Sequence, residues 1–514
     1  MITPLDILSI ETWVLIISLL ALGRYYIHRK WQYLKNINIP HEPCSIRKFG
    51  HLSYTFGAET ALQYDNKCKE KFGNVYGTYF GITPTVHIHD PDILRQIFIK
   101  EFSNFAMRQR RFLKISGEEL NNSLTNVDLK QWKRMRNTLT PTFSSAKLRQ
   151  MTTIMEWCAD NAIVALNKKV ENNGGVFNSK DFFSRISLDV VCSAAFSTKV
   201  DSINDTENEP EIVKKAKELM KGGGVLSKLF VLLIVLSEFL EKVLEKLNIP
   251  LVRGESLKYF RRLTDHVIEK RKNNPHDTGR VDLMQLMLDA EISPDKVKEG
   301  AEKGLTKIEI IGNSMLMIMA GYQNTGNLMS WTSFNFARHP EIQAKVQEEI
   351  DEMIKTHGKL DYDGINGLKF LDMCINETLR LYTPIIRNAR IAERETTING
   401  LTIPAGLLVA IPVYGLAHDP DYWDEPFAYK PERMRDMSQI DPMMFQPFGA
   451  GPRNCIGLRF ALIEVKMALA KILHQFTIKP AENTPEAPMK FKFTNTLAPA
   501  VNFDLKVEPR NVAE

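Results

Sequence analysis

The chain has 514 residues, a formal net charge of +5, 44% hydrophobic residues and 25% charged residues. These fractions are ordinary for a globular protein, and the mild basic excess fits a membrane surface, an acidic protein partner or a plain solvated surface, with no sign of a nucleic-acid partner. No two of the six cysteines form a CxxC pair, which argues against a closed zinc site or a four-thiolate iron–sulfur cluster and suits reduced, cytosolic thiols.

An almost wholly apolar segment over residues 12–23 lies near the N-terminus. Together with the residues up to Ile27, it is about long enough for one helical membrane span. Basic residues follow this segment, whereas acidic residues precede it. A cleaved signal peptide needs the reverse order, so we expect an uncleaved anchor over residues 1–30, with the chain after it on the cytosolic side. A linker over 31–50 and a single domain over 51–514 complete the expected organisation.

Short strands are expected between residues 73 and 89, where VYGTYF and TVHIH each suit a strand bounded by turns. Helical patterns dominate from residue 91 to about residue 381. A second apolar run, over residues 222–236, is too short for a comfortable membrane span. It suits equally a buried helix or a segment that dips into the membrane beside the anchor.

The longest expected helix runs over residues 305–339. Thr306 and Glu309 have the spacing of a capping box at its start. Gly321 and Gly326 lie in its middle, although interior glycines weaken a helix. We therefore expect another part of the molecule to approach the helix backbone closely at these two positions.

A lone cysteine lies in a glycine-rich loop near the C-terminus, FQPFGAGPRNCIGLRFA. Gly449, Gly451 and Gly457 allow backbone conformations that a side chain would block. A helix is expected directly after Cys455, so its thiol would face free backbone N–H groups, and Arg453 adds positive charge; both favour the thiolate. Such a thiolate suits a nucleophile, a redox centre or a metal ligand, and the structural alternative is a small buried cysteine in a turn.

The spacing Phe-Gly-x-Gly-x-Arg-x-Cys-x-Gly resembles the haem-binding loop of the cytochrome P-450 superfamily. The matching residues are Phe448, Gly449, Gly451, Arg453, Cys455, Gly457 and Ala461. The resemblance implies haem b, iron protoporphyrin IX, as the cofactor, with the Cys455 thiolate as axial iron ligand. An axial thiolate pushes electron density onto the iron and favours O–O cleavage.

Three further motifs carry the same resemblance. NETLRLY holds Glu377 and Arg380 at the spacing of the family's ExxR helix, and KPERM supplies Arg433 as the expected third member of a buried charged network that braces the cysteine loop. QWKRMRN supplies Trp132 and Arg136, which match the family's propionate-binding helix. The full set expected to bind the cofactor is Cys455, Trp132, Arg136, Arg390, Arg453, Phe448 and Ala320.

The resemblance covers residues 37–507 and looks most like the animal microsomal group that holds broad drug- and steroid-oxidising enzymes and thromboxane synthase. It implies a mainly α fold with a small β region, the cytochrome P-450 prism, preceded by an N-terminal membrane-anchor helix. One haem would lie between the long central helix and the cysteine loop. The group also implies a location at the endoplasmic reticulum membrane, with the catalytic domain in the cytosol.

The middle of the central helix departs from the family pattern. Ala320 and the two residues after it match, but Gln323 takes the position of the usual acid and Asn324 that of the usual alcohol. Glutamine cannot supply a proton as a carboxylic acid does, whereas asparagine can still orient a water molecule. Thr325 follows one position later, about 100° around the helix, so it should not simply substitute. Gln323, Asn324 and Thr325 are the candidate catalytic residues.

Three functions are compatible with the resemblance and its departure. The first is a monooxygenase that inserts one oxygen atom of O2 into a lipophilic small molecule, such as a steroid, lipid or xenobiotic, with electrons from NADPH. Its partners would be a flavoprotein NADPH–cytochrome reductase and a cytochrome b-type haem protein. The second is an isomerase of ready-made peroxides or endoperoxides, of the thromboxane-synthase type, which needs no proton relay for dioxygen. The third is a non-catalytic haem protein.

The family pattern also places a reductase-binding surface and the walls of a substrate pocket. Candidate contacts with the acidic surface of the reductase are Lys130, Lys133, Arg134 and Arg459. Candidate walls of the substrate pocket are Met319, Ala320, Ile385, Ile386 and Leu497. The chain from about Arg108 to Leu124 should cap this pocket.

Overall fold

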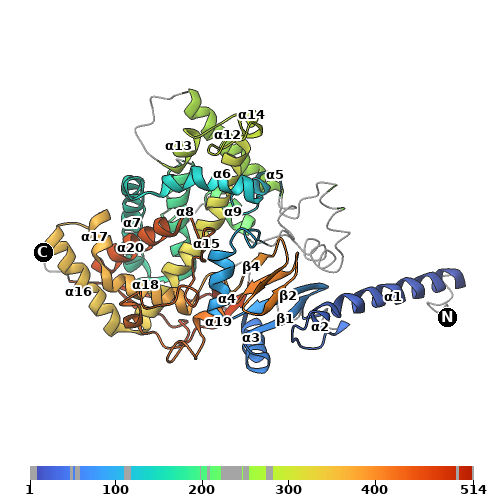
Figure 1. Ribbon diagram of the computed structural model, residues 1–514. Helices are drawn as coiled ribbons and strands as arrows, with labels where there is room; N and C mark the ends of the chain where they lie inside the picture. Colours follow the sequence, from blue (N-terminus) through green and yellow to red (C-terminus); the bar gives the residue numbers. More distant parts are fainter. Residues whose placement is uncertain are drawn as a thin grey trace, which may run out of the picture.

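The computed structural model describes residues 9–46, 50–51, 58–108, 117–196, 198–204, 209–220, 254–273, 282–493, 497–499 and 501–511, together with residues 243 and 246. Helices make up most of this part of the chain, and a small β region lies beside the point where the first helix leaves the body of the molecule (Figure 1). The expected mainly α fold with a small β region is therefore confirmed. The apolar run over residues 222–236 lies outside the described residues.

The helices of the described chain differ widely in length. The longer ones are α1 (Ile10–Trp31), α3 (Ala58–Phe72), α6 (Leu129–Leu139), α7 (Ser145–Asn173), α8 (Ser179–Phe196), α9 (Glu211–Met220), α12 (Gly254–Asn273), α15 (Lys307–Arg338), α16 (Pro340–His357), α18 (Lys369–Leu381) and α20 (Leu458–Gln475). The shorter ones are α2 (Tyr33–Asn36), α4 (Pro91–Arg95), α5 (Glu118–Asn121), α13 (Leu283–Leu288), α14 (Pro294–Lys298), α17 (Tyr362–Gly367), α19 (Val413–Ala417), η3 (Gln96–Lys100), η4 (Thr140–Phe143) and η5 (Pro431–Met434).

The β region is built around one four-stranded sheet with the strand order β1-β2-β7-β4. Its strands are β1 (Val75–Phe80), β2 (Thr83–Ile88), β7 (Leu408–Ile411) and β4 (Asn388–Ile391), of which β2 and β7 run parallel and the other neighbours antiparallel. The two strands expected between residues 73 and 89 are thus confirmed. The remaining strands form small sheets: β3 (Val176–Asn178), β11 (Asp504–Pro509) and β8 (Phe476–Pro480); β9 (Phe491–Phe493) and β10 (Leu497–Pro499); β5 (Thr396–Ile398) and β6 (Leu401–Ile403).

The central helix α15 is the longest helix in the described chain and packs along α8. Its capping box is confirmed, because the Glu309 carboxylate accepts the Thr306 backbone N–H at 2.8 Å. Both interior glycines lie at the α8 contact: a Cβ at Gly326 would approach the backbone of Ser184 to 2.7 Å, and one at Gly321 would meet Val191 at 2.6 Å. The close approach expected from these glycines is therefore confirmed.

The N-terminal helix α1 projects from the body beside the sheet (Figure 1). Its apolar side chains face outward: Leu20, for example, is 68% exposed, and only Trp31 at the end of the helix is buried. Among the described residues, α1 is the one helix long and apolar enough to cross a membrane. A helix with so much exposed apolar surface needs a nonpolar environment, which a bilayer provides.

Candidate functional site

The cysteine loop turns sharply before α20. Gly449 and Gly451 have positive φ angles of 75° and 70°, and a Cβ at Gly451 would lie 2.3 Å from the carbonyl oxygen of Phe98. The Cys455 backbone N–H donates to the Phe448 carbonyl at 2.8 Å, which closes the loop on itself. Gly457 differs from the expectation: its φ is −88°, and no atom lies within 4 Å of an added Cβ. The loop therefore requires two glycines, and the third is not needed for backbone freedom.

Part of Cys455 is accessible to solvent, although many protein atoms surround its thiol. Burial raises the pKa of its thiol above the ordinary value, and this effect outweighs the backbone N–H groups of Gly457 and Leu458 and the charges of Arg136 and Arg108, which lower the pKa. The helix N-terminus was expected to favour the thiolate, but the net direction is the opposite. The reason is that partial charges at a helix end are weaker than the desolvation of an anion.

Four arginines surround the approach to Cys455, and we call Arg108, Arg136, Arg390 and Arg453 the arginine cluster. Arg108 donates to the Arg453 carbonyl at 3.1 Å, and Arg136 donates to the carbonyl and side-chain oxygens of Asn454 at 3.0 and 2.8 Å. These bonds tie separate segments, α6 among them, to the cysteine loop.

Aromatic rings support the other two members of the cluster. The Arg453 guanidinium lies 4.5 Å from the centre of the Trp132 ring, and the Arg390 guanidinium lies 4.8 Å from that of Phe98. Arg390 belongs to β4 and also donates to Asn388 Oδ1 and the Ala389 carbonyl. The sheet and α6 therefore hold two guanidinium groups flat against ring faces.

In the described part of the chain, Asp128 is the one acid that raises the pKa of a member of the arginine cluster, Arg453, and burial outweighs it. None of the cluster's four members forms an ion pair with a carboxylate of the described residues, and Nε and one terminal nitrogen of Arg453 and Nε of Arg108 are buried without a hydrogen-bond partner. Burial and the neighbouring arginines lower the pKa of Arg390 to about 9 and that of Arg453 to about 10. Buried cations with unused donors fit an anionic group that brings its own carboxylates, as the two propionates of haem do.

A second set of charged residues forms ion pairs within the chain. Arg380 donates to the Glu377 carboxylate at 2.9 and 2.8 Å, and both side chains are completely buried. Arg433 also reaches Glu377, at 3.3 Å, and the remaining donors of Arg380 bind the backbone carbonyls of Ala417, Pro426 and Ala428. The structure thus brings the three residues expected in the bracing network into contact: two guanidinium groups share one carboxylate, and backbone carbonyls accept the remaining donors of Arg380.

The middle of α15 presents a small side chain and one unused acceptor. Ala320 is exposed, and Gln323 is half-buried. The Asn324 side-chain nitrogen donates to the Ala320 carbonyl at 2.9 Å, which leaves Oδ1 buried without a hydrogen-bond partner. Thr325 is buried. Of the three candidates, Asn324 is therefore the one with a buried polar atom that lacks a hydrogen-bond partner.

Several positions differ from the expectations. Arg134 is buried and pairs with Glu309, and it also donates to the Gly304 carbonyl, so it cannot be a surface contact for a reductase. Ile386 and Leu497 are buried in the main hydrophobic core, with 5% and 0% exposure. Ile385 is half exposed. Position in a family pattern did not reveal which of two adjacent side chains faces inward.

Sequence reasoning missed Arg108 as part of the site. The sequence predicts Arg108 only as the start of a pocket-capping segment, of which residues 109–116 lie outside the described residues. Arg108 is the first of several arginines in RQRRFLK, and nothing in that pattern separates it from its neighbours. Its contact with Arg453, 345 positions away in the chain, exists only in the folded molecule.

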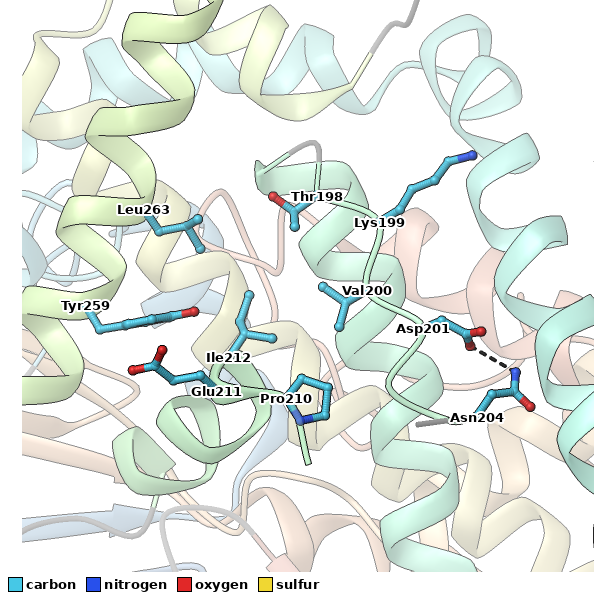
Figure 2. A pocket seen from close by; sticks show the side chains of 10 residues that line it. All are labelled: Thr198, Lys199, Val200, Asp201, Asn204, Pro210, Glu211, Ile212, Tyr259 and Leu263. Carbon is cyan, nitrogen blue, oxygen red and sulfur yellow. Dashed lines mark hydrogen bonds between the residues drawn. The ribbon is translucent and has the colours of Figure 1, made fainter. Parts of the chain in front are cut away.

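A surface pocket of about 700 Å³ lies elsewhere, between the segment after α8, the start of α9 and the side of α12 (Figure 2). Val200, Ile212 and Leu263 contribute apolar surface to it, and Tyr259 and Glu211 stand at one side. Neither Cys455 nor a member of the arginine cluster lines this pocket. The chemistry of the cysteine loop, and not the presence of this hollow, therefore identifies the candidate site.

Comparison with known proteins gives a consistent result. The family model described as Cytochrome P450 matches residues 40–507. The chain is 36% identical over 507 residues to Cytochrome P450 3A5 of Homo sapiens, with 98% of each chain covered. It is 37% identical over 509 residues to Cytochrome P450 3A11 of Mus musculus and 36% identical over 512 residues to Cytochrome P450 3A31 of Mesocricetus auratus, again with 98% of each chain covered.

Proposed function

The chain belongs to the cytochrome P450 family and is a monooxygenase, an oxidoreductase, and from this premise we propose its reaction, partners and location. It inserts one oxygen atom of O2 into a lipophilic small molecule, with electrons that NADPH supplies through a flavoprotein reductase and with a cytochrome b-type haem protein as a further donor. The observation that carries this proposal is the arginine cluster beside Cys455, because it places buried, uncompensated cations next to a thiol.

The cofactor is a haem with a cysteine thiolate ligand, and Cys455 is the residue that would provide the thiolate. When bound, the haem supplies the oxidising chemistry at its iron. The arginine cluster would hold its carboxylates, so that the unpartnered donors of Arg108 and Arg453 gain charge-assisted hydrogen bonds. Haem b is the form we propose, because the sequence has no CxxCH motif for covalent attachment.

Asn324 positions water in the proposed reaction. Its side-chain nitrogen is held by the Ala320 carbonyl, so Oδ1 is the atom that accepts a hydrogen bond from a water molecule or a substrate hydroxyl. Neither Asn324 nor Gln323 can release a proton, so the proton comes from the water that Asn324 holds. Thr325 is buried and takes no part in this arrangement.

The wall of the substrate space is apolar where the structure describes it. Ala320 is exposed, Met319 is half-buried, and Ile385 is half exposed. Burial of an apolar substrate against such side chains is favoured by about 25 cal/mol for each Å² removed from water. This supports a lipophilic substrate.

The reductase is proposed to bind on the side of α6 and α20 that lies nearest Cys455. Lys130 and Lys133 on α6 and Arg459 on α20 are all exposed. α6 also carries Arg136, which contacts the cysteine loop, so basic groups on this helix stand close to the electron acceptor. The anchor α1 supports membrane association, and we place the protein at the endoplasmic reticulum with residues 51–514, the catalytic domain, in the cytosol.

The test is coupling: product formed for each NADPH consumed, with reductase, a panel of lipophilic substrates and an assay for released hydrogen peroxide. Product that keeps pace with NADPH supports the proposed monooxygenase reaction. The variant Cys455→Ser is the control and should lose the thiolate signature of the ferrous carbon monoxide spectrum together with turnover.

A peroxide or endoperoxide isomerase remains the second candidate, favoured by the Gln323–Asn324 pair, which lacks an acid and an alcohol. Such an enzyme would rearrange lipid peroxides without NADPH or reductase. Rapid rearrangement of added lipid peroxides, combined with NADPH lost entirely to hydrogen peroxide, would replace the monooxygenase proposal. A protein that binds haem but turns over neither class of substrate would be the non-catalytic alternative.

A further inference from the structure

A second pocket, of about 710 Å³, lies where the anchor helix joins the body of the protein. One wall is a single helical face made by His28, Trp31, Gln32 and Lys35, which have the i, i+3, i+4, i+7 spacing. These residues span α1 and α2, and Gln32 between the two helices keeps a right-handed helical backbone with φ −83° and ψ −11°. We call this hollow the junction pocket.

The junction pocket has a rigid base. The Trp31 ring N–H donates to the Gly81 carbonyl at 2.9 Å, and the Tyr79 hydroxyl donates to the Trp31 carbonyl at 2.9 Å. Leu34 is fully buried against Gly77, where an added Cβ would come within 2.6 Å of the Leu34 side chain. α1 and α2 are therefore fixed against β1, and the pocket shape does not depend on a free linker.

The lining combines apolar surface with basic groups and contains no acid. Ile39, Pro40, Pro43, Cys44 and Phe72 form its apolar part. Lys35 supplies a cation, and it has no carboxylate partner among the described residues. The Nε2 of His28 accepts from the Gln32 side-chain nitrogen at 3.5 Å, so its Nδ1–H is the donor, whereas the His41 Nδ1–H already donates to the Ile39 carbonyl at 2.9 Å. The acid nearest in sequence, Glu42, is already paired with Lys71 at 2.7 Å. The charge of the pocket suits an anion.

The position of the pocket indicates an amphiphile. The helical face that lines it continues toward the N-terminus through Arg24, Ala21, Ile17 and Val14. Ile17 and Val14 are 61% and 58% exposed and lie in the apolar stretch that suits a bilayer. His28 and Trp31 follow that stretch by about one turn, where the phosphate level of a bilayer would be if α1 spans it. An anionic group in the pocket would therefore have acyl chains directly beneath it, along α1.

We propose that the junction pocket binds one anionic phospholipid, with its phosphate against Lys35 and His28 and its acyl chains along the face of α1 that carries Ile17 and Val14. The proposal goes beyond the oxidation reaction and rests only on α1 lying in a bilayer. It assigns a lipid-binding function to the base of the anchor.

The experiment is native mass spectrometry of the full-length holoenzyme in a mild detergent, titrated with phosphatidylserine or with phosphatidylcholine. The wild type should retain one phosphatidylserine and hold phosphatidylcholine less tightly. Lys35→Gln removes one cation near the headgroup and should weaken phosphatidylserine binding about fivefold. Gln32→Phe leaves the charge unchanged but fills the pocket, and it should also weaken binding.

Arg29→Gln is the matched control. Arg29 carries the same charge as Lys35 and lies near it at the end of α1, but it does not line the pocket. If Arg29→Gln and Lys35→Gln weaken binding equally and Gln32→Phe has no effect, the attraction is that of a general basic belt and the proposal is wrong. Inorganic phosphate is the third probe: displacement of the lipid by millimolar phosphate would show a site for phosphate alone and overturn the lipid assignment. The haem absorption spectrum should be unchanged in all three variants, which confirms that they are folded.

Discussion

Two buried groups of arginines in this molecule are built in opposite ways. Arg380 and Arg433 share the Glu377 carboxylate, and the remaining Arg380 donors bind backbone carbonyls. Arg390 and Arg453, in contrast, lie against aromatic rings, repel each other and have no acidic partner among the described residues. The first group has its acidic partner within the chain, whereas the second group has buried guanidinium donors without a hydrogen-bond partner in the described part of the chain.

The difference separates a structural brace from a binding site. A paired buried charge is destabilising only when a partner is removed, because the other charge is then left alone. A buried cation without a partner is destabilising from the beginning, and an anionic ligand relieves that penalty. Substitutions in the two groups should therefore change the stability of the cofactor-free protein in opposite directions.

The largest effect is expected at Glu377. Glu377→Ala leaves Arg380 and Arg433 unpaired in the interior and should lower the free energy of unfolding by about 3–5 kcal/mol, measured by urea denaturation. Where this variant yields no soluble protein, Glu377→Gln keeps the shape and removes only the charge, and it should unfold at lower urea than the wild type. Asp295→Ala, which breaks the exposed pair with Lys298, is the control and should change stability by less than about 0.5 kcal/mol. Equal losses of stability for Glu377→Ala and Asp295→Ala would contradict a structural role for the Glu377 network.

Removal of an arginine from the arginine cluster should raise the stability of the cofactor-free protein. Arg390→Gln relieves repulsion with Arg108 and Arg453, so the cofactor-free protein should gain about 1–2 kcal/mol against urea. The holoenzyme should lose haem to an acceptor protein at least about tenfold faster, because one charge-assisted contact is gone. Cofactor-free protein that is destabilised by Arg390→Gln would show that Arg390 is a structural residue and would remove the contrast with Glu377.

Glu464 provides a further test of the contrast between paired and unpaired buried charges, because no cation of the described residues acts on its carboxylate. Both carboxylate oxygens of Glu464 on α20 are buried without a hydrogen-bond partner, and burial raises its pKa to about 8 from the ordinary value of 4.5. Ser187 is the one neighbour that lowers this pKa, and no charged group contributes. The folded protein therefore keeps this proton between pH 4.5 and pH 8, whereas the unfolded chain releases it.

Stability should then fall as the pH rises across that window, and the penalty should be complete above about pH 8. Glu464→Gln removes the ionisation, so it should match the wild type near pH 4.5 and exceed its stability by about 4 kcal/mol near pH 8.5. Thermal unfolding across this range measures the difference. Glu348→Gln, at an exposed acid on α16, is the matched control and should change stability by less than about 0.5 kcal/mol. A flat difference for Glu464→Gln would mean that the carboxylate is ionised and paired.

Exposed charges should have the smallest effect. Lys133→Glu on α6 should slow the first electron transfer from the reductase about two- to fivefold at low salt, and the effect should vanish at high salt because exposed charges are screened. Stopped-flow reduction of the haem measures this rate. Lys355→Glu on α16 reverses an equally exposed charge and should leave the rate unchanged. A reduction rate that Lys133→Glu does not alter would remove α6 from the proposed docking surface.

Much of the fold and part of the site were predictable because their signals are local. The capping box of α15 depends on residues three apart, and the need for glycine at Gly321 and Gly326 follows from the weakness of such residues within a helix. The cysteine loop and the Glu377–Arg380 pair likewise depend on short spacings, which one helical turn or one tight loop converts directly into geometry.

Contacts between distant segments were not predictable in this way. Arg134 and Arg136 are two positions apart on α6, yet Arg134 is paired with Glu309 and Arg136 reaches Asn454 at the cysteine loop. Both are basic residues on one amphipathic helix, and their sequence context is nearly the same. The packing of α6 between α15 and the cysteine loop decides which of them becomes structural and which faces the site.

Residue types at short spacing were enough to predict the family, the anchor helix, Cys455 as the candidate ligand and the altered Gln323–Asn324 pair. Only the tertiary structure decided that Arg108 joins the arginine cluster, that burial outweighs the helix end in setting the pKa of Cys455, and that Leu497 belongs to the core. Desolvation and charge compensation depend on every atom around a group, and those atoms come from segments that only folding brings together.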